Sequence, residues 1–466
     1  MSGVPGAGWS RPVALVVATA FFFETFDATV LVTATPAIAR DFGVGAADVG
    51  LAMTAYLLAV AVFIPVSGWA ADRWGARRVF CAAIVVFVVA SLLCALSADL
   101  LSLVLARTLQ GVGGSMMVPV GRLIVLRTTD KPELLRAIAY LTWPALVAPV
   151  IAPLAGGLIT QFLGWPWIFY VNLPLGVALF AVATRVIPRD EARAGRRLDL
   201  VGLVGVSATL AALVLGLERV ASADGLPAGA GLLGAAAVTG VLTVRRLRAV
   251  RVPLLDLSSY RVASFRVTNS SGVWYRTAVS AVPFLLPLLM QDGFGWSPVA
   301  AGAMVMWVFV GNLAVKPATS WLIGRLGFAP VMVCSAVGVA LTLLAVATMT
   351  ADTPIVVVAA VLLLSGVFRS TGFTAYGTIQ FADIPPDRMN GANTLSATLV
   401  QVASGLGVAV AAVVVRVADG AGQDGLAPYR WALVVMAAIA GLSAVGAARL
   451  PPGVADEVRR RVRSPA

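Results

Sequence analysis

Apolar residues occur along this chain in long, nearly uninterrupted runs, separated by short segments rich in arginine, glycine and proline. Most runs hold roughly 20 residues, the length an α-helix needs to cross a hydrocarbon layer about 30 Å thick. The alternation of apolar and polar positions over roughly ten residues that is typical of a membrane-spanning barrel does not occur. Because a backbone in lipid must satisfy its own hydrogen bonds, these runs predict membrane-spanning helices.

We predict fourteen spans, with boundaries good to a few residues. They cover residues 13–33, 49–68, 80–96, 100–125, 138–159, 167–187, 200–217, 230–244, 267–290, 299–323, 331–349, 354–374, 395–415 and 431–446. The expected fold class is therefore an all-α integral membrane protein. Its predicted parts are an N-terminal six-helix bundle (1–187), a linker with two inserted spans (188–266), a C-terminal six-helix bundle (267–450) and a basic tail (451–466).

Composition and charge agree with this pattern. Of the 466 residues, 59% are hydrophobic and 12% are charged, whereas soluble domains carry about 25% charged residues. The net charge of +12 comes from arginines placed between the apolar runs. Of the 34 lysines and arginines, 25 lie at the termini and in alternate loops, and the opposite loops hold only Arg40, Arg219, Arg416 and Arg430. This asymmetry predicts that both termini are cytoplasmic, and it explains the basic charge without a nucleic-acid partner.

Residue types that commonly bind metals or cofactors are scarce. The chain has no histidine, and its cysteines, Cys81, Cys94 and Cys334, lie inside apolar runs without a metal-ligand spacing. No phosphate-binding loop of the type GxxxxGK[ST] is present. We therefore expect no metal and no cofactor, and we disfavour a membrane-embedded enzyme and an ATP-driven pump.

The two halves of the chain repeat one another at an offset of 252 residues. The segment 41–50 (DFGVGAADVG) aligns with 293–302 (GFGWSPVAAG), and 69–75 (WAADRWG) aligns with 321–327 (WLIGRLG). Pro65 and Pro317 match at the same offset. We interpret spans one to six and nine to fourteen as copies of one six-span unit. Copies with the same orientation are related by an axis along the membrane normal, which predicts a transport site at their interface.

Four motifs resemble those of the major facilitator superfamily. Residues 68–78 (GWAADRWGARR) resemble its GxxxDRxGRR signature, and residues 105–114 (LARTLQGVGG) resemble its fourth-span RxxQG motif. Residues 148–157 (APVIAPLAGG) are similar to its antiporter motif, whose helix-packing positions here are Pro149, Pro153, Gly156 and Gly157. Residues 26–36 match the first-span pattern of the fourteen-span drug:proton antiporters (EmrB/QacA type), and residues 110–122 are similar to the MdtD branch.

The resemblance implies a bacterial secondary transporter in the cytoplasmic membrane. It would work by alternating access, export a small molecule and draw its energy from the proton gradient. We expect a monomer surrounded by lipid. The sequence leaves import open as an alternative direction.

Two carboxylates in the first span are candidates for proton coupling. Glu24 and Asp27 are three residues apart and so lie on nearly one helical face. Two carboxylates in a dry environment cannot both ionise cheaply, so at least one should bind a proton and could carry it across the membrane. The resemblance implies that Arg107 acts as the counter-ion. The alternative is that Arg107 only forms a structural ion pair, and the sequence does not say which carboxylate carries the proton.

Four further cations fall within predicted spans: Arg122, Arg276, Lys316 and Arg369. Charges are costly in lipid and usually mark function. Their positions predict a basic vestibule in the cytoplasmic half of the membrane, lined also by Gln110, Tyr275 and Asn312. Because arginine binds carboxylates bidentately, we expect an anionic or polycarboxylate substrate, or a citrate-like metal chelate. Alternatively, each cation reaches the lipid headgroups or pairs singly, and the chain is a multidrug efflux antiporter for lipophilic or cationic compounds.

The loop between the second and third spans is predicted to form a cytoplasmic gate, as the resemblance implies. Asp72 should cap or face a helix N-terminus and pair with an arginine. The other gate residues are Arg73, Gly75, Arg77 and Arg78. A loop that only fixes topology is the alternative. In the second copy Gly324 replaces the aspartate, so the two copies should differ here.

Overall fold

The computed structural model describes residues 10–44, 46–130, 133–190, 198–221, 225–250, 253–422, 425–451 and 454, and every regular element in these ranges is a helix. The N-terminal half contains α1 (Arg11–Phe42), α2 (Ala46–Trp74), α3 (Ala76–Ala95), α4 (Leu100–Thr128), α5 (Leu134–Phe162), α6 (Trp167–Tyr170) and α7 (Asn172–Val186). Two inserted helices follow, α8 (Leu200–Ala221) and α9 (Leu226–Ala249).

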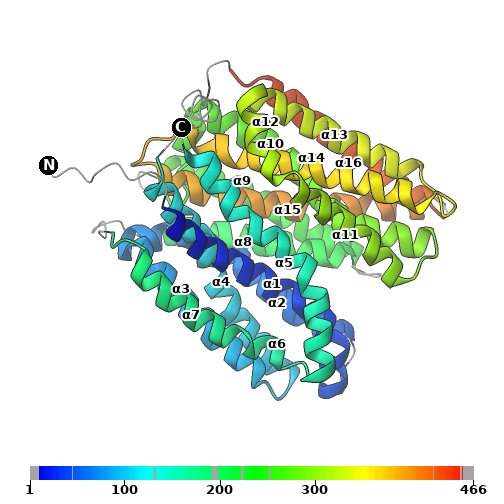
Figure 1. Ribbon diagram of the computed structural model, residues 1–466, viewed down its shortest axis with the longest axis horizontal. Coiled ribbons are helices and arrows are strands. Elements are labelled where there is room, and N and C mark those ends of the chain that lie inside the picture. The colour runs from blue at the N-terminus through cyan, green and yellow to red at the C-terminus, as the bar shows by residue number, and fades with distance from the viewer. Residues whose placement is uncertain are drawn as a thin grey trace.

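The C-terminal half starts with the short helix η2 (Leu257–Arg261). It continues with α10 (Ala263–Leu288), η3 (Leu289–Gly293), α11 (Pro298–Ala314), α12 (Lys316–Leu326), α13 (Phe328–Thr348), α14 (Ile355–Ala382), α15 (Met389–Gly420) and α16 (Ala427–Ala448). Figure 1 shows the two halves side by side, with the start of α1 and the end of α16 at the same end of the bundle. We call this the basic end, since Arg73, Arg77 and Arg127 lie in the helix termini there.

Among the described residues, twelve helices are long and apolar enough to cross a membrane. The bent pair α11 and α12 raises this number to 13. A further 29-residue helix, α5, packs along α1, but several of its side chains lie outside the described residues. The protein is therefore a multi-pass helical membrane protein, and the count of fourteen spans stays a prediction.

Two predicted spans are interrupted. The sixth is divided into α6 and α7 at Val171. The tenth bends by 54° between α11 and α12, at Val315. The cause of this bend is local, since Pro317 has no main-chain N–H to donate to Leu313, four residues earlier. Its repeat mate Pro65 lies within the continuous helix α2, so the same proline is accommodated differently in the two copies.

The repeat is visible in the backbone at the loops that follow α2 and α12. Gly75 has φ 88° and precedes α3, while Gly327 has φ 92° and precedes α13. Residues with a side chain rarely adopt a positive φ, whereas glycine does so readily. These two glycines are separated by the repeat offset of 252 residues and form the same turn in each half.

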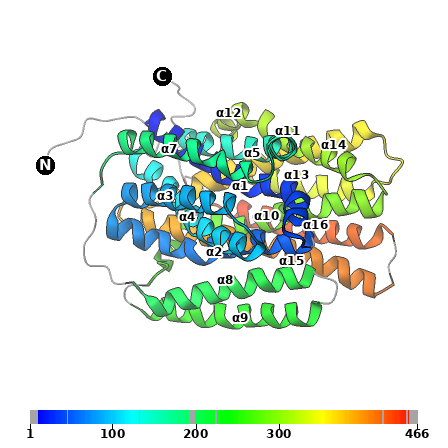
Figure 2. The same cartoon turned by 90° about the horizontal axis from the view of Figure 1, so that it is seen from below.

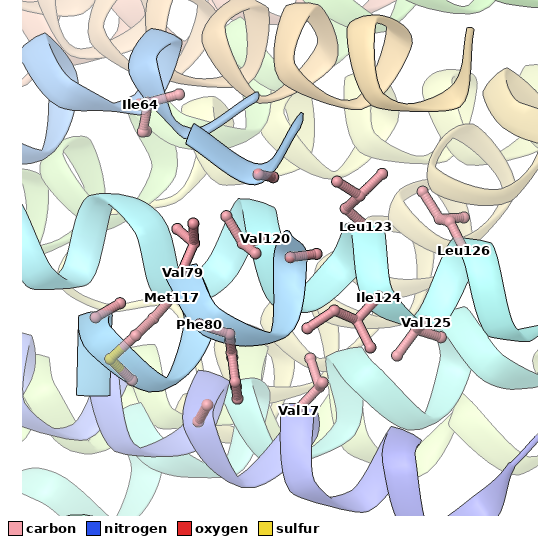
Figure 3. Close-up of a cluster of buried hydrophobic side chains, with 14 of the residues drawn as sticks. Val17, Ile64, Val79, Phe80, Met117, Val120, Leu123, Ile124, Val125 and Leu126 are labelled. Carbon is pink, nitrogen blue, oxygen red and sulfur yellow. The ribbon is translucent and has the colours of Figure 1, made fainter. Parts of the chain in front are cut away.

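The hydrophobic core is shared between the halves at the basic end. One buried cluster contains side chains from the helices α1, α2, α3 and α4 together with Phe381, Met389 and Leu395 of the C-terminal half. Figure 3 shows its N-terminal part, where Val17, Phe80 and Ile124 pack together. Two further clusters each stay within one half: one around Phe26 and Trp165 in the N-terminal half, and the other around Leu285 and Leu433 in the C-terminal half. The two halves are therefore joined mainly at the basic end.

The inserted helices α8 and α9 form a hairpin on one face of the bundle (Figure 2). Helix α8 contacts both α2 and α15, so the hairpin touches both halves.

Candidate functional site

Asp27 lies in a buried polar network inside the N-terminal half. Its Oδ2 accepts a hydrogen bond of 2.6 Å from Nη1 of Arg107. Its Oδ1 accepts hydrogen bonds from the side-chain amides of Gln110, at 3.0 Å, and Asn172, at 2.6 Å. Asp27 is 1% exposed and Arg107 is 1% exposed. Three donors therefore satisfy the side chain of Asp27 within the N-terminal half.

The network is closed on its other sides as well. Ser91 accepts hydrogen bonds from Gln110, at 2.8 Å, and Asn172, at 3.3 Å. The guanidinium of Arg107 lies over the ring of Tyr56 at 4.4 Å. All these residues belong to the N-terminal half, so Asp27 does not face the C-terminal half. Gln110, which was predicted to line the substrate site, lies in this network. No sequence pattern pointed to Ser91 or Asn172.

Glu24 has a different environment. Its Oε1 accepts one long hydrogen bond of 3.5 Å from the hydroxyl of Tyr56, and its Oε2 has no hydrogen-bond partner among the described residues. Glu24 lines a cavity of about 300 Å³ between the two halves. The same cavity is lined by Arg122 of α4 and by Gln401 of α15. Glu24 is therefore the carboxylate that faces the interface.

Most of the cavity wall is apolar. Leu57, Val60 and Ile64 of α2 and Val118 of α4 form it on one side, and Val400 of α15 contributes from the C-terminal half. Glu24 is the only carboxylate among its described lining residues. We call this space the central cavity. An apolar wall with one carboxylate and one guanidinium can bind an amphiphilic organic molecule and orient its charged group.

Two of the predicted vestibule cations, Arg276 and Arg369, lie near the middle of α10 and α14. Nη1 of Arg276 and both Nε and Nη1 of Arg369 are buried without hydrogen-bond partners among the described residues. Arg276 lies close enough to Arg122 for the two charges to repel one another. Each half thus places a cation near a cation of the other half.

The remaining vestibule residues are held by neighbours within the C-terminal half. Tyr275 donates hydrogen bonds to the carbonyls of Phe368, at 2.9 Å, and Arg369, at 3.2 Å, and stacks on Tyr376 with ring centres 5.0 Å apart. Nζ of Lys316 donates to Thr374 at 2.8 Å. Neither residue lines the central cavity.

Asn312 also lies inside the C-terminal half and is completely buried. Its side-chain oxygen and nitrogen have no partner among the described residues.

The predicted gate contains an ion-pair chain at the basic end. Asp72 pairs with Arg127 at 3.2 Å, and Arg127 also contacts Asp190 at 3.5 Å. The carboxylate at the N-terminus of α3 is that of Asp190, which accepts hydrogen bonds from the main-chain N–H groups of Ala76, at 2.6 Å, and Arg77, at 3.2 Å. The expected capping role of Asp72 therefore belongs to Asp190. No local signal singles out Asp190, because it lies more than 110 residues from the helix it caps.

The other gate residues are less tightly held. Arg73 and Arg78 are exposed, while the guanidinium of Arg77 donates to the carbonyl of Thr184.

Two asparagines of α15 connect the halves next to this gate. Asn390 donates to the carbonyl of Gly68 at 2.7 Å, and Asn393 donates to the carbonyl of Pro119 at 2.8 Å. A Cβ atom on Gly68 would overlap the hydroxyl of Thr394. These contacts and the shared core close the basic end of the interface.

The antiporter-type motif lies on α5, which packs along α1. Ala148 and Ala152 are completely buried there with Phe26 and Ala34. Of the four predicted packing residues, Pro149 is half-buried, Gly156 is buried and Gly157 is exposed. The side chain of Pro153 lies outside the described residues. This motif joins helices within the N-terminal half.

Comparison with known proteins agrees with this architecture. Residues 17–265 and 269–465 match the family model of the Major Facilitator Superfamily. The chain is 33% identical over 460 residues to MdtD of Cronobacter sakazakii, covering 96% of this chain and 97% of that protein. It is 34% identical, with the same coverage, to MdtD of Escherichia coli strain SMS-3-5. Both relatives are named for multidrug resistance.

Two solved structures share the fold at 15% sequence identity. The human organic anion transporter MFSD10 has a TM-score of 0.69 and covers 94% of this chain and 99% of its own. A bacterial homologue of the iron transporter ferroportin, in an outward-facing state, has a TM-score of 0.66 and covers 94% and 98%.

Proposed function

The chain belongs to the major facilitator superfamily, and from that premise we propose that it exports small organic molecules in exchange for protons by alternating access. The family is one of transporters, so the chain is a secondary transporter and not an enzyme. The observation that carries the proposal is the central cavity, where one carboxylate, Glu24, faces an apolar space between the two halves.

Glu24 is the proton carrier in this proposal. Asp27 accepts hydrogen bonds from Arg107 and two amides, so protonating it would disrupt a satisfied network. Glu24 has one weak hydrogen bond, and its proton would meet no competing donor. It lies at the interface that must open alternately to the two sides, whereas Asp27 holds Arg107 in place.

Exchange follows from competition for one carboxylate. A cationic or amphiphilic substrate binds the ionised carboxylate of Glu24 and packs against Leu57, Val60 and Val400. Protonation removes the charge that attracts the substrate, so substrate and proton occupy the cavity in turn. Because the basic end is closed, and predicted to be cytoplasmic, the proposal assigns this conformation to the step at which substrate leaves and a proton arrives from outside.

An anionic substrate, as expected from the sequence, is a second candidate. Arg122 lines the central cavity. The guanidinium groups of Arg276 and Arg369 each hold at least one buried nitrogen without a hydrogen-bond partner among the described residues. For such a substrate the sign of the coupling is reversed: protonation of Glu24 would leave the positive charge of Arg122 less compensated and would strengthen binding.

The pH dependence of substrate binding to the full chain in proteoliposomes separates these candidates. For a cationic dye we expect affinity to fall on acidification in the wild type, and E24Q to abolish both the pH dependence and proton-driven efflux. D27N is the matched carboxamide variant. It should impair folding or the placement of Arg107, but the fraction of the protein that inserts should still bind the dye with a pH-dependent affinity. Affinity for an organic acid that rises on acidification, and is lost in R122A, supports the second candidate. Wild-type efflux by E24Q would refute the role of Glu24.

A further inference from the structure

The inserted hairpin leaves a second large space at the side of the bundle. Helix α9 packs mainly on α8, and α8 makes the contacts with α2 and α15. Between α8, α9, the segment 253–261 and α15 lies a cavity of about 810 Å³, which we call the hairpin cavity. Leu395, Thr398, Leu399 and Val402 of α15 face it, whereas Val400 and Gln401 face the central cavity. Helix α15 therefore separates the two spaces.

The interior of the hairpin cavity is apolar. Its wall includes Val206 and Leu210 of α8, Leu247 of α9, and Leu399 and Val402 of α15. Water in such a space would lack most of its hydrogen-bond partners. A hydrocarbon chain fits such a space. Helix α9 is itself largely exposed. A chain lying here would cover part of that exposed face.

The mouth of the cavity is basic. Arg248, near the end of α9, and Arg261, at the end of η2, both line it with exposed side chains. The only acidic residue among its described lining is Asp256. Both oxygens of Asp256 already accept hydrogen bonds of 2.8 Å from the main-chain N–H and the hydroxyl of Ser258. Among the described residues, neither Arg248 nor Arg261 forms an ion pair with Asp256, and two positive charges face one negative charge in this lining.

We propose that the hairpin cavity binds an anionic phospholipid, with an acyl chain between α9 and α15 and the phosphate at Arg248 and Arg261. The charge pattern and the apolar interior fit the two parts of this molecule, and basic pockets between helices on the cytoplasmic side bind such headgroups. The bound lipid would connect the hairpin to α15, one of the helices that join the two halves. This proposal is independent of the transported substrate.

The test uses the full chain purified in neutral detergent and titrated with phosphatidylglycerol or with phosphatidylcholine of the same acyl chains. Bound lipid is counted by native mass spectrometry, and the unfolding midpoint is followed in parallel. We expect saturable binding of phosphatidylglycerol that raises the midpoint. The double variant R248A/R261A should bind it roughly tenfold or more weakly and keep the wild-type midpoint without lipid, because both side chains are exposed.

The matched control is R245A/R266A, which removes two exposed arginines that do not line the cavity. It should bind phosphatidylglycerol like the wild type. A second variant, Leu399→Trp, fills the apolar part and should weaken binding with both arginines present. Equal binding of the two lipids, equal losses in the two double variants, or full stabilisation by soluble glycerol phosphate would each overturn the proposal.

Discussion

The side-chain amide of Asn390 on α15 donates a hydrogen bond of 2.7 Å to the carbonyl of Gly68 on α2, 322 residues earlier in the chain. The contact is possible because Gly68 has no side chain: a Cβ there would overlap Thr394. It lies beside the Asp72–Arg127 ion pair. The geometry of the gate therefore depends on a close approach between the halves as well as on charge.

We expect Gly68→Ala to open the basic end. The added methyl group overpacks the interface at a cost of about 1–3 kcal/mol, which shifts a two-state equilibrium by roughly 5- to 150-fold. Labelling of single cysteines introduced along the α2–α15 contact should increase. The matched control is Gly50→Ala in the same helix, where a Cβ meets no atom within 4 Å. Unchanged labelling in Gly68→Ala would contradict the closing role.

Arg107→Ala should strongly destabilise the N-terminal half. The substitution leaves the buried carboxylate of Asp27 without its cation, and breaking a buried pair costs about 3–5 kcal/mol. The unfolding midpoint in detergent should fall clearly. Arg136→Ala is the control, because its ion pair with Glu133 is at the surface and should contribute less than about 1 kcal/mol. Equal midpoints for the two variants would show that the network is not a stability element.

Gly366→Ala should separate α11 from α14. A Cβ at Gly366 would overlap the carbonyl of Val308, which is main chain and cannot rotate away. We expect a loss of about 1–3 kcal/mol, read as a lower unfolding midpoint. Gly302→Ala on α11 has open space around its Cβ and should be neutral or slightly stabilising. A neutral Gly366→Ala would show that this helix crossing is loose.

Asp99 lies at the end of the bundle opposite the basic end, as the N-cap of α4. It should make the stability of the protein depend on pH in the acid range. The main-chain N–H of Ser102 donates to Asp99 at the start of α4 and holds the pKa of its carboxyl below the usual value of 3.8. A carboxyl with a lowered pKa stabilises the folded state above its unfolded pKa, and this contribution is lost as the pH falls through the folded value. The midpoint advantage of the wild type over Asp99→Asn should thus be present at neutral pH and be lost as the pH falls below 3.8 and through the lowered pKa of the folded state. A constant difference across this range would contradict the charge effect.

The sequence predicted the membrane-spanning helices because lipid demands apolar runs of a fixed length, and these are local properties. The repeat was likewise readable, since Gly75 and Gly327 occupy one motif whose turn needs a positive φ in both copies. The family followed from the motifs between residues 26 and 157. The arginine distribution predicts the orientation of the termini in the same local way.

Only the tertiary structure decided what each polar side chain faces. Glu24 and Asp27 differ by about 60° around α1, yet one lines the central cavity and the other is enclosed by Arg107, Gln110 and Asn172. Asp190 reaches the N-terminus of α3 across more than 110 residues. Spacing along a helix fixes the direction of a side chain, but the neighbours that satisfy it come from helices whose positions depend on packing throughout the bundle.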